Sequence, residues 1–277
     1  MRQHAARPRL KAAAGLCAAG ALSLCCAGPR AAPTASASGA AAAEETSALD
    51  AARLRAIVDA ADRADADRAI DGGRKPAATL AFIGARPGWR VAELGAGGGY
   101  TTELLARSVA PGGVVYAQNP PAWLNGFLKE SWPRRLARPA MANVVRVDRD
   151  FDAPLPPEAT NLDAVVSNAA YHDTVNMKVD RAKMNAAVFA ALKPGGEYVV
   201  IDSSAVDGHG LADTGTLHRI DEATVKAEVE QAGFRLGAES DFLRNPEDLR
   251  DWSSSPGFAG ARRGTGDRFA LKFIKPG

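Results

Sequence analysis

Cysteine is rare in this 277-residue chain, and the three that occur, Cys17, Cys25 and Cys26, all lie within the first 28 residues. The rest of the chain therefore contains no disulfide, no thiolate nucleophile and no metal site built on cysteine. A domain without cysteine suits an oxidising compartment.

Acidic residues are absent from residues 1–28, although this segment carries four basic side chains, Arg2, Arg7, Arg9 and Lys11. An uncharged run rich in Ala, Leu and Cys follows from residue 12 to residue 28, too short and too rich in small residues for a comfortable membrane span. This order is typical of a secretory signal peptide. We therefore predict that residues 1–28 are a signal peptide and that the mature chain is periplasmic or secreted. Lipid attachment at Cys25 or Cys26 is an alternative, which the large side chain of Leu24 disfavours.

A surplus of positive charge is also missing once this segment is set aside. The whole chain has 34 Lys and Arg against 32 Asp and Glu, so the part after residue 28 carries 30 basic and 32 acidic side chains. This balance does not indicate a nucleic-acid partner. We expect no nucleic-acid partner and no transmembrane span in the mature chain.

The segment before the main domain divides into a linker and a helical cap. Residues 29–46 are mostly Ala, Ser, Thr and Pro, a composition typical of a flexible linker. Residues 47–86 are predicted to be an N-terminal helical cap, with helices over 47–61 and 76–83 and a break at Asp71-Gly72-Gly73. This cap is either a lid with Asp71, Arg74 or Lys75 facing the substrate, or a solvated cover on the sheet.

Residues 87–277 alternate between the patterns of strands and helices. Apolar runs typical of strands occur at 91–94, 114–117, 144–147, 164–167, 198–201, 234–238 and 269–274. Helical patterns occur at 101–109, 122–136, 179–192 and 222–232. This order predicts an α/β fold with a doubly wound, mostly parallel seven-stranded sheet. Only a loop separates the last two strands, so we expect an antiparallel C-terminal hairpin at the edge.

The most informative stretch is the glycine-rich segment Glu93-Leu94-Gly95-Ala96-Gly97-Gly98-Gly99, between a predicted strand and a predicted helix. Ligands of open α/β sheets bind at such turns, because the backbone is exposed and the helix N-terminus points at the ligand. The dinucleotide fingerprint G-x-G-x-x-G, counted from Gly95, would need glycine at Tyr100. This mismatch disfavours an NAD(P)-dependent oxidoreductase.

The pattern E-x-G-x-G-x-G instead resembles the first motif of the Rossmann-like (class I) S-adenosylmethionine (SAM)-dependent methyltransferases. The resemblance implies that the turn, Gly95, Ala96, Gly97 and Gly99, accommodates the methionine part of SAM, and that Glu93 helps to hold its amino group. The alternative is an ordinary glycine-rich turn in another α/β enzyme.

The ends of the next three strands supply the other residues that the resemblance assigns to SAM. Asn119 stands where the family usually has an acid that binds the ribose hydroxyls; it can accept one such hydrogen bond, or it simply begins a turn. Asp150 with Phe151 matches the adenine position, with Asp148 as the competing acid. Asn168 ends the fourth strand beside the glycine turn, across the point where the strand order reverses.

Candidate catalytic residues follow the fourth strand and the fifth. His172 could deprotonate an acceptor hydroxyl or amine, and Tyr171 could orient the acceptor; a structural hydrogen bond at a helix start is the alternative for His172. The turn Leu192-Lys193-Pro194-Gly195-Gly196 resembles the family's lead-in to the fifth strand. The polar segment after it makes His209, Asp213, His218 and Arg219 candidate acceptor contacts, and His218 is also predicted to be catalytic. The three histidines with Asp173 and Asp213 could in principle bind a metal, but their spacing matches no local ligand pattern, so we predict no metal site.

The resemblance to the SAM-dependent methyltransferases extends from about residue 75 to the last residue of the chain. Its Asn-Pro-Pro, Tyr-His-Asp and Thr-Leu-His-Arg-Ile-Asp segments also resemble a bacterial subgroup of predicted methyltransferases that carry export signals. The predicted function is methyl transfer from SAM to a small-molecule or cell-envelope acceptor whose identity does not follow from the sequence, nor does the number of subunits. The alternatives are an exported binding protein that kept this fold without catalysis, or an NAD(P)-dependent oxidoreductase.

Overall fold

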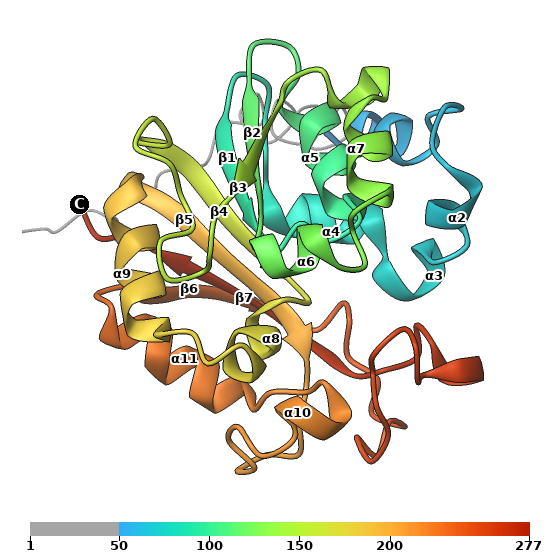
Figure 1. Cartoon of the computed structure of the whole chain (residues 1–277), viewed down its shortest axis with the longest axis vertical. Helices are drawn as coiled ribbons and strands as arrows, with labels where there is room; N and C mark the ends of the chain where they lie inside the picture. Colours follow the sequence, from blue (N-terminus) through green and yellow to red (C-terminus); the bar gives the residue numbers. More distant parts are fainter. Residues whose placement is uncertain (1–49) are drawn as a thin grey trace, which may run out of the picture. The chain divides into compact units, whose positions relative to one another are not determined.

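The computed structural model describes residues 50–277 (Figure 1). The predicted signal peptide and the predicted linker lie outside the described residues.

A seven-stranded sheet forms the centre of the described part of the chain, in the order β3-β2-β1-β4-β5-β7-β6. The first five strands pair in parallel, while β7 runs antiparallel to both β5 and β6. The prediction of a doubly wound sheet with an antiparallel C-terminal hairpin is confirmed, and β7 lies inside the sheet with β6 at its edge. The strands are β1 (Arg90–Leu94), β2 (Val114–Asn119), β3 (Val144–Asp148), β4 (Leu162–Asn168), β5 (Leu192–Ser203), β6 (Arg235–Ser240) and β7 (Arg268–Ile274).

Helices cover both faces of this sheet (Figure 1). One face packs against α9 (Arg181–Ala191) and α11 (Glu222–Gln231), and the other against α4 (Pro76–Ile83) and α5 (Tyr100–Val109). Alternate residues of β5 serve the two cores: Tyr198 and Val200 lie in the first, Val199 and Ile201 in the second. This alternation is the two-residue period of a strand that is buried on both faces.

Two helical predictions need correction. The single helix expected over residues 122–136 is two short helices, α6 (Pro121–Asn125) and α7 (Ser131–Leu136), because Gly126 leaves the helical region. The stretch after β4, expected as a loop, contains the helix α8 (Tyr171–Asn176). A 3₁₀ turn (Pro139–Met141) precedes β3, and a four-residue helix α10 (Thr214–Leu217) follows β5.

The cap before β1 consists of helical residues 50–58 and three further helices, α2 (Asp65–Arg68), α3 (Asp71–Arg74) and α4. Arg135 of α7 joins the cap to α5 and to the glycine-rich turn: its guanidinium is 2.7 Å from carboxylate oxygens of both Asp67 and Glu103 and donates to the carbonyl of Gly98. None of the helices within residues 50–277 is both long and apolar enough to cross a bilayer.

The connector between β6 and β7, residues 241–267, is long and contains a second 3₁₀ turn (Gly260–Arg262). It is held by the ion pair between Arg219 and Asp248 (2.9 Å), both nearly fully buried. This connector therefore packs as part of the domain, next to the carboxyl ends of the central strands.

Candidate functional site

The glycine-rich turn between β1 and α5 has a backbone that glycine alone adopts freely. Gly95, Gly97 and Gly99 have φ values of 65°, 56° and 82°. A Cβ at Gly95 would lie 2.5 Å from the Cβ of Ala170, and one at Gly99 would lie 2.8 Å from Cγ of Arg135. At Gly97 the nearest atom in the described residues is the carbonyl oxygen of Gly95 at 4.0 Å, so this position faces open space.

The end of β2 holds the turn in place. The amide of Gly95 donates to Oε1 of Gln118 (2.9 Å), and the amide of Gly97 donates to Oδ1 of Asn119 (2.8 Å). Asn119 also donates from Nδ2 to the Gly97 carbonyl (3.2 Å) and is fully buried. Its role at a ribose stays a prediction; here both ends of its amide position the glycine turn.

Beneath the turn lies the carboxylate of Glu93, which accepts a hydrogen bond from the Thr102 hydroxyl. Burial raises the pKa of Glu93 to about 7, although the Thr102 bond and the positive charge of Arg74 oppose the rise. An acid with this pKa changes its charge near neutral pH, and a cation bound beside it would favour the ionised form.

An aromatic wall borders the turn on the side of β3. Phe151 is buried, and its ring meets that of Trp123 edge to face with centroids 5.7 Å apart. Both rings are within 3.4 Å of the position that a Cβ on Gly95 would occupy. Asp150 beside them is exposed. The structure thus brings Phe151 to the turn and adds Trp123, which the sequence did not single out.

The segment after β4 faces the turn from the other side, as the strand order predicts. Asn168 donates to the Thr101 hydroxyl (3.1 Å) and accepts from Arg268 (2.6 Å). Ala169 follows in the left-handed region at φ 61°, and Ala170 contacts the Gly95 position. A non-glycine residue held at positive φ is uncommon and marks a backbone constrained by its surroundings.

His172 of α8 points to the same edge of the sheet and is held by Asp202 of β5. Asp202 is fully buried and accepts the backbone amides of His172 and Ser203 and a bond from Nδ1 of His172 (2.8 Å). An ionised carboxylate only accepts hydrogen bonds, so Nδ1 of His172 carries a proton, and Nε2 faces outward. Burial lowers the pKa of His172, but the Asp202 carboxylate outweighs it and raises the pKa to about 9.

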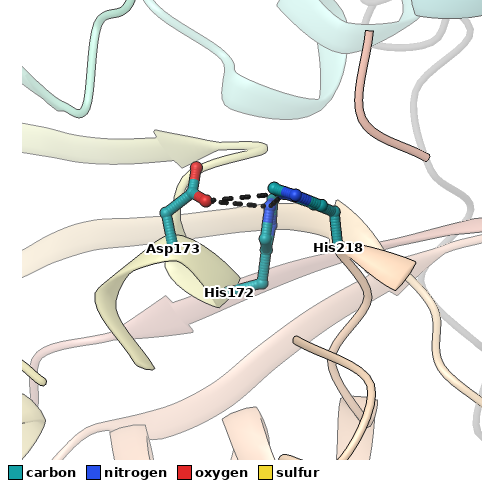
Figure 2. Close-up of side chains that lie close together, drawn as sticks. All are labelled: His172, Asp173 and His218. Atoms are coloured by element: carbon teal, nitrogen blue, oxygen red, sulfur yellow. Dashed lines mark hydrogen bonds and ion pairs between the residues drawn. The ribbon is translucent and has the colours of Figure 1, made fainter. Parts of the chain in front are cut away.

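Two further side chains converge on Nε2 of His172 (Figure 2). Nδ1 of His218 is 3.3 Å away, and Oδ1 of Asp173 is also 3.3 Å away. His218 lies at the end of α10 with φ 51°, another non-glycine residue in the left-handed region. We refer to His172, Asp173 and His218 as the histidine cluster.

Tyr171, predicted beside His172, is not brought to this cluster. Its side chain is fully buried in the core, where its hydroxyl donates to Glu228 (2.8 Å) and accepts from Asn185 (2.9 Å). Successive helical residues point about 100° apart, so Tyr171 and His172 face different surroundings. Of the two, only His172 lies at the candidate site.

A cavity of about 440 Å³ opens at the carboxyl ends of β4 and β5. Its walls come from α3, from the residues after β4 and β5, and from the connector 241–267. Three of its lining residues are basic, Arg74, Arg263 and Arg268. Of the three cap residues predicted to face substrate, Arg74 lines the cavity, Asp71 is bound to Arg63, and Lys75 donates to the Phe242 carbonyl.

Arg74 and Arg268 face the cavity without an anionic partner. Within residues 50–277 neither forms an ion pair with a carboxylate, and Arg74 lies over the ring of Tyr100 at 4.9 Å. Burial and the nearby charge of Arg74 lower the pKa of Arg268 to about 10. Two cations this close are stabilised when an anion binds between them.

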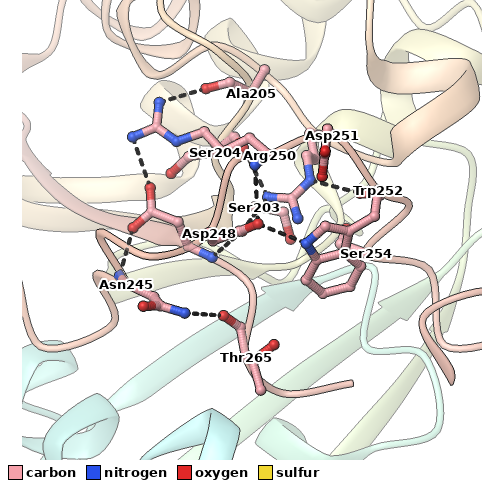
Figure 3. A network of polar contacts seen from close by, with 12 residues as sticks. Ser203, Ser204, Ala205, Asn245, Asp248, Arg250, Asp251, Trp252, Ser254 and Thr265 are labelled. Atoms are coloured by element: carbon pink, nitrogen blue, oxygen red, sulfur yellow. Dashed lines mark hydrogen bonds and ion pairs between the residues drawn. The ribbon is translucent and has the colours of Figure 1, made fainter. Parts of the chain in front are cut away.

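The connector 241–267 forms the outer wall of this cavity through polar contacts (Figure 3). Trp252, a lining residue, donates from its indole to Asp248 (2.7 Å), and Arg250 donates to the carbonyl of Ala205 (2.8 Å). The Ser254 hydroxyl donates to the backbone carbonyl of His218 (2.6 Å), which joins the wall to the histidine cluster.

The sequence did not single out Asp202, Trp252 or Arg268 as site residues. Asp202 could have been found as a carboxylate at the carboxyl end of an apolar strand, and Arg268 as a charge that opens one. Trp252 carries no comparable local signal, because its place depends on how the connector folds back.

Known structures resemble this fold. A predicted sarcosine dimethylglycine methyltransferase from Galdieria sulphuraria aligns with a TM-score of 0.51 at 19% identity, covering 74% of this chain and 85% of that one. A chain from the complex between a methyltransferase activator and a predicted methyltransferase of Haloferax volcanii aligns with a TM-score of 0.52 at 16% identity, covering 81% and 98%. No protein-family profile matches the chain.

These similarities define the fold as that of the Rossmann-like, class I SAM-dependent methyltransferases. The sheet order and the glycine-rich turn after β1 agree with that fold.

Proposed function

We propose that this protein is a SAM-dependent methyltransferase that transfers the methyl group of SAM to an acceptor held beside the histidine cluster. The observation that carries the proposal is the turn at Gly95, Gly97 and Gly99, which leaves open space at Gly97 on the edge where ligands of such sheets bind. The shared fold of the structural neighbours supports it.

The residues around the turn fit the amino-acid end of SAM, which carries an ammonium and a carboxylate. Glu93 lies beneath the turn and gains from a nearby cation, because its charge is otherwise buried without a basic hydrogen-bond partner in the described residues. The positive charges of Arg74 and Arg268 are stabilised by a nearby anion. We therefore assign the ammonium to the side of Glu93 and the carboxylate to the two arginines.

Bound SAM supplies a sulfonium methyl group that an acceptor displaces in line. The chain's own contribution is to bind and align the two reactants, which can supply a large part of the rate enhancement, and to keep water away. The aromatic wall of buried Phe151 and partly buried Trp123 would exclude water on one side of the turn, and the connector 241–267 would do so at the cavity. The histidine cluster would position the nucleophilic atom of the acceptor.

Binding and transfer are tested separately. Calorimetry should show SAM and its demethylated product binding the wild-type protein, with binding lost in Gly97→Val. Arg74→Gln should weaken SAM about 10- to 100-fold, the worth of a charge-assisted hydrogen bond. Arg86→Gln, which removes the same charge from an exposed turn, should leave the affinity unchanged.

Transfer itself is followed with methyl-labelled SAM and an extract of cell-envelope material. Label in the extract supports the methyltransferase. Binding of SAM without label transfer to envelope or soluble extracts would favour a binding protein that kept the fold. Failure to bind SAM at millimolar concentration would refute both.

We also propose that the chain is exported and that residues 1–28 direct it. The basic start and the uncharged run that follows support this. Cell fractionation should find the full chain outside the cytoplasm and a chain without residues 1–28 within it. The same location for both would contradict the proposal.

A further inference from the structure

We propose that the histidine cluster binds a divalent transition-metal ion, with zinc as the preferred occupant, through Nε2 of His172, Nδ1 of His218 and Oδ1 of Asp173. Its ligands are not residues that we assign to SAM, and the proposal does not depend on the proposed methyl transfer. No metal site was predicted from these residues, because His218 is 46 residues from His172 and no local motif joins them.

The first argument is the spacing of the three ligand atoms. They lie 3.3, 3.3 and 3.7 Å from one another. Zinc bonds of about 2.0–2.1 Å in a tetrahedron place neighbouring ligand atoms about 3.3–3.4 Å apart, whereas an octahedron of the same bond length would place them about 2.8–3.0 Å apart. The cluster is therefore already close to three corners of a tetrahedron.

The second argument is the tautomer of His172. Because Nδ1 donates to the ionised Asp202, Nε2 is the ring nitrogen that faces a carboxylate oxygen and a second imidazole nitrogen, where it can hold a proton or, after losing it, bind a metal ion. Two lone-pair atoms this close repel each other unless a cation or a proton lies between them. A carboxylate that holds the far nitrogen of a histidine is also the common support of a metal-bound histidine.

The third argument is access. The side chain of His172 is 7% exposed, while those of His218 and Asp173 are 30% and 25% exposed, so solvent reaches the cluster through His218 and Asp173. Ser254 and Ser203, which line the cavity, bond to His218 and Asp202. Three protein ligands with an open fourth position are typical of a metal that contacts a small molecule rather than of a structural zinc.

The test uses the full-length chain with Cys17, Cys25 and Cys26 replaced by Ser, so that no thiol competes. After chelation, Zn²⁺ and Co²⁺ are titrated by calorimetry, and bound Co²⁺ is followed by its visible absorption. We expect one equivalent bound, with the strong visible bands of tetrahedral Co²⁺.

Variants assign the site. His218→Asn keeps a residue that tolerates positive φ, and Asp173→Asn keeps the shape of the side chain; each should weaken binding about 100-fold or more, since even outer partners of such ligands are worth about 10- to 100-fold. His209→Asn removes a more exposed histidine that pairs with Asp213 (2.9 Å) and should leave the affinity for the metal ion unchanged. Circular dichroism identifies any variant that fails to fold. Metal binding by the other, folded cluster variant then decides whether the cluster is the site.

The proposal is overturned if the wild-type chain binds neither ion at a one-to-one ratio. It is also overturned if both folded cluster variants bind as tightly as the wild type, or if His209→Asn alone abolishes binding. In the first case a proton shared between His172 and Asp173 would account for the geometry.

Discussion

Glu93 shows how burial of one carboxyl group links stability to pH. Folding raises its pKa from 4.5 to about 7, so between these values the folded chain holds a proton that the unfolded chain releases. The free energy of unfolding should therefore fall as the pH rises from 4.5 to 7, by up to about 3 kcal/mol from this group, and level off above pH 7.

Urea unfolding of wild type and Glu93→Gln at intervals from pH 5 to pH 8 measures this contribution, because other groups cancel in the difference. The free energy of unfolding of Glu93→Gln should depend less on pH than that of the wild type. Its stability relative to the wild type should therefore increase as the pH rises. Parallel curves for the two proteins would show that Glu93 ionises normally.

Gly95 and Gly97 share positive φ values but differ in their surroundings, so alanine should have different effects at the two positions. In Gly95→Ala the new methyl group meets the Cβ of Ala170, and strain and collision together should cost about 2 to 4 kcal/mol. In Gly97→Ala only the strain remains, about 1 kcal/mol, but the methyl group occupies the space proposed for SAM.

Denaturant unfolding and SAM calorimetry on the same two proteins separate these effects. Gly97→Ala should be the more stable and yet bind SAM more weakly than wild type. Equal stability loss at both positions, or full SAM affinity in Gly97→Ala, would contradict the assignment.

At the scale of elements, the connector 241–267 depends on the ion pair between Arg219 and Asp248. Removing one partner leaves the other charge buried, which typically costs about 3 to 5 kcal/mol. Asp248→Ala should lose this much stability in denaturant unfolding, because Arg219 is fully buried.

Asp251→Ala is the matched control for that loss. Asp251 pairs with Arg262 at 3.7 Å on the same connector, but both side chains are more than 60% exposed, so its removal should cost less than about 1 kcal/mol. A loss of the same size in both variants would show that the connector is stabilised by its backbone and not by the buried pair.

The elements also show what a sequence can and cannot predict. Periodic apolar runs located all seven strands to within a few residues, except β5, which begins earlier. For β1 and β4 the reason is that a strand buried on both faces reads as a nearly continuous apolar segment. The break at Gly126 was missed, since a glycine within a helical pattern has no fixed outcome. The connector was read as a simple loop because its contacts to Arg219 and Ser204 are long-range.

The same distinction between local signals and long-range contacts applies to the candidate site. Glycine spacing located the turn, because conformation at Gly95 and Gly97 is a local property. The direction of Tyr171 and the partners of Asn119 depend on neighbouring elements, so both differ from a simple extrapolation. His172 and His218 were both predicted to be catalytic, but their direct contact could not be predicted, because it is set by the fold of a segment 46 residues away.

At the scale of the whole molecule, SAM bound at the central turn should stabilise the entire domain. A ligand at 100 times its Kd adds about 2.7 kcal/mol, which in a domain of this size raises the melting temperature by about 5 to 10 °C. Thermal unfolding with saturating SAM should show this shift, and NADH should give none. A shift with NADH alone would support an oxidoreductase instead.

Because β7 lies between β5 and β6, β6 has no partner in the sheet until residues 268–274 have been synthesised. The same strand begins with Arg268, so its arrival completes the anion-facing wall of the cavity as well. A chain still emerging from the ribosome thus holds an unpaired strand and an unfinished pocket. Assembly of the sheet and onset of ligand binding should therefore coincide, at the point where β7 leaves the ribosome.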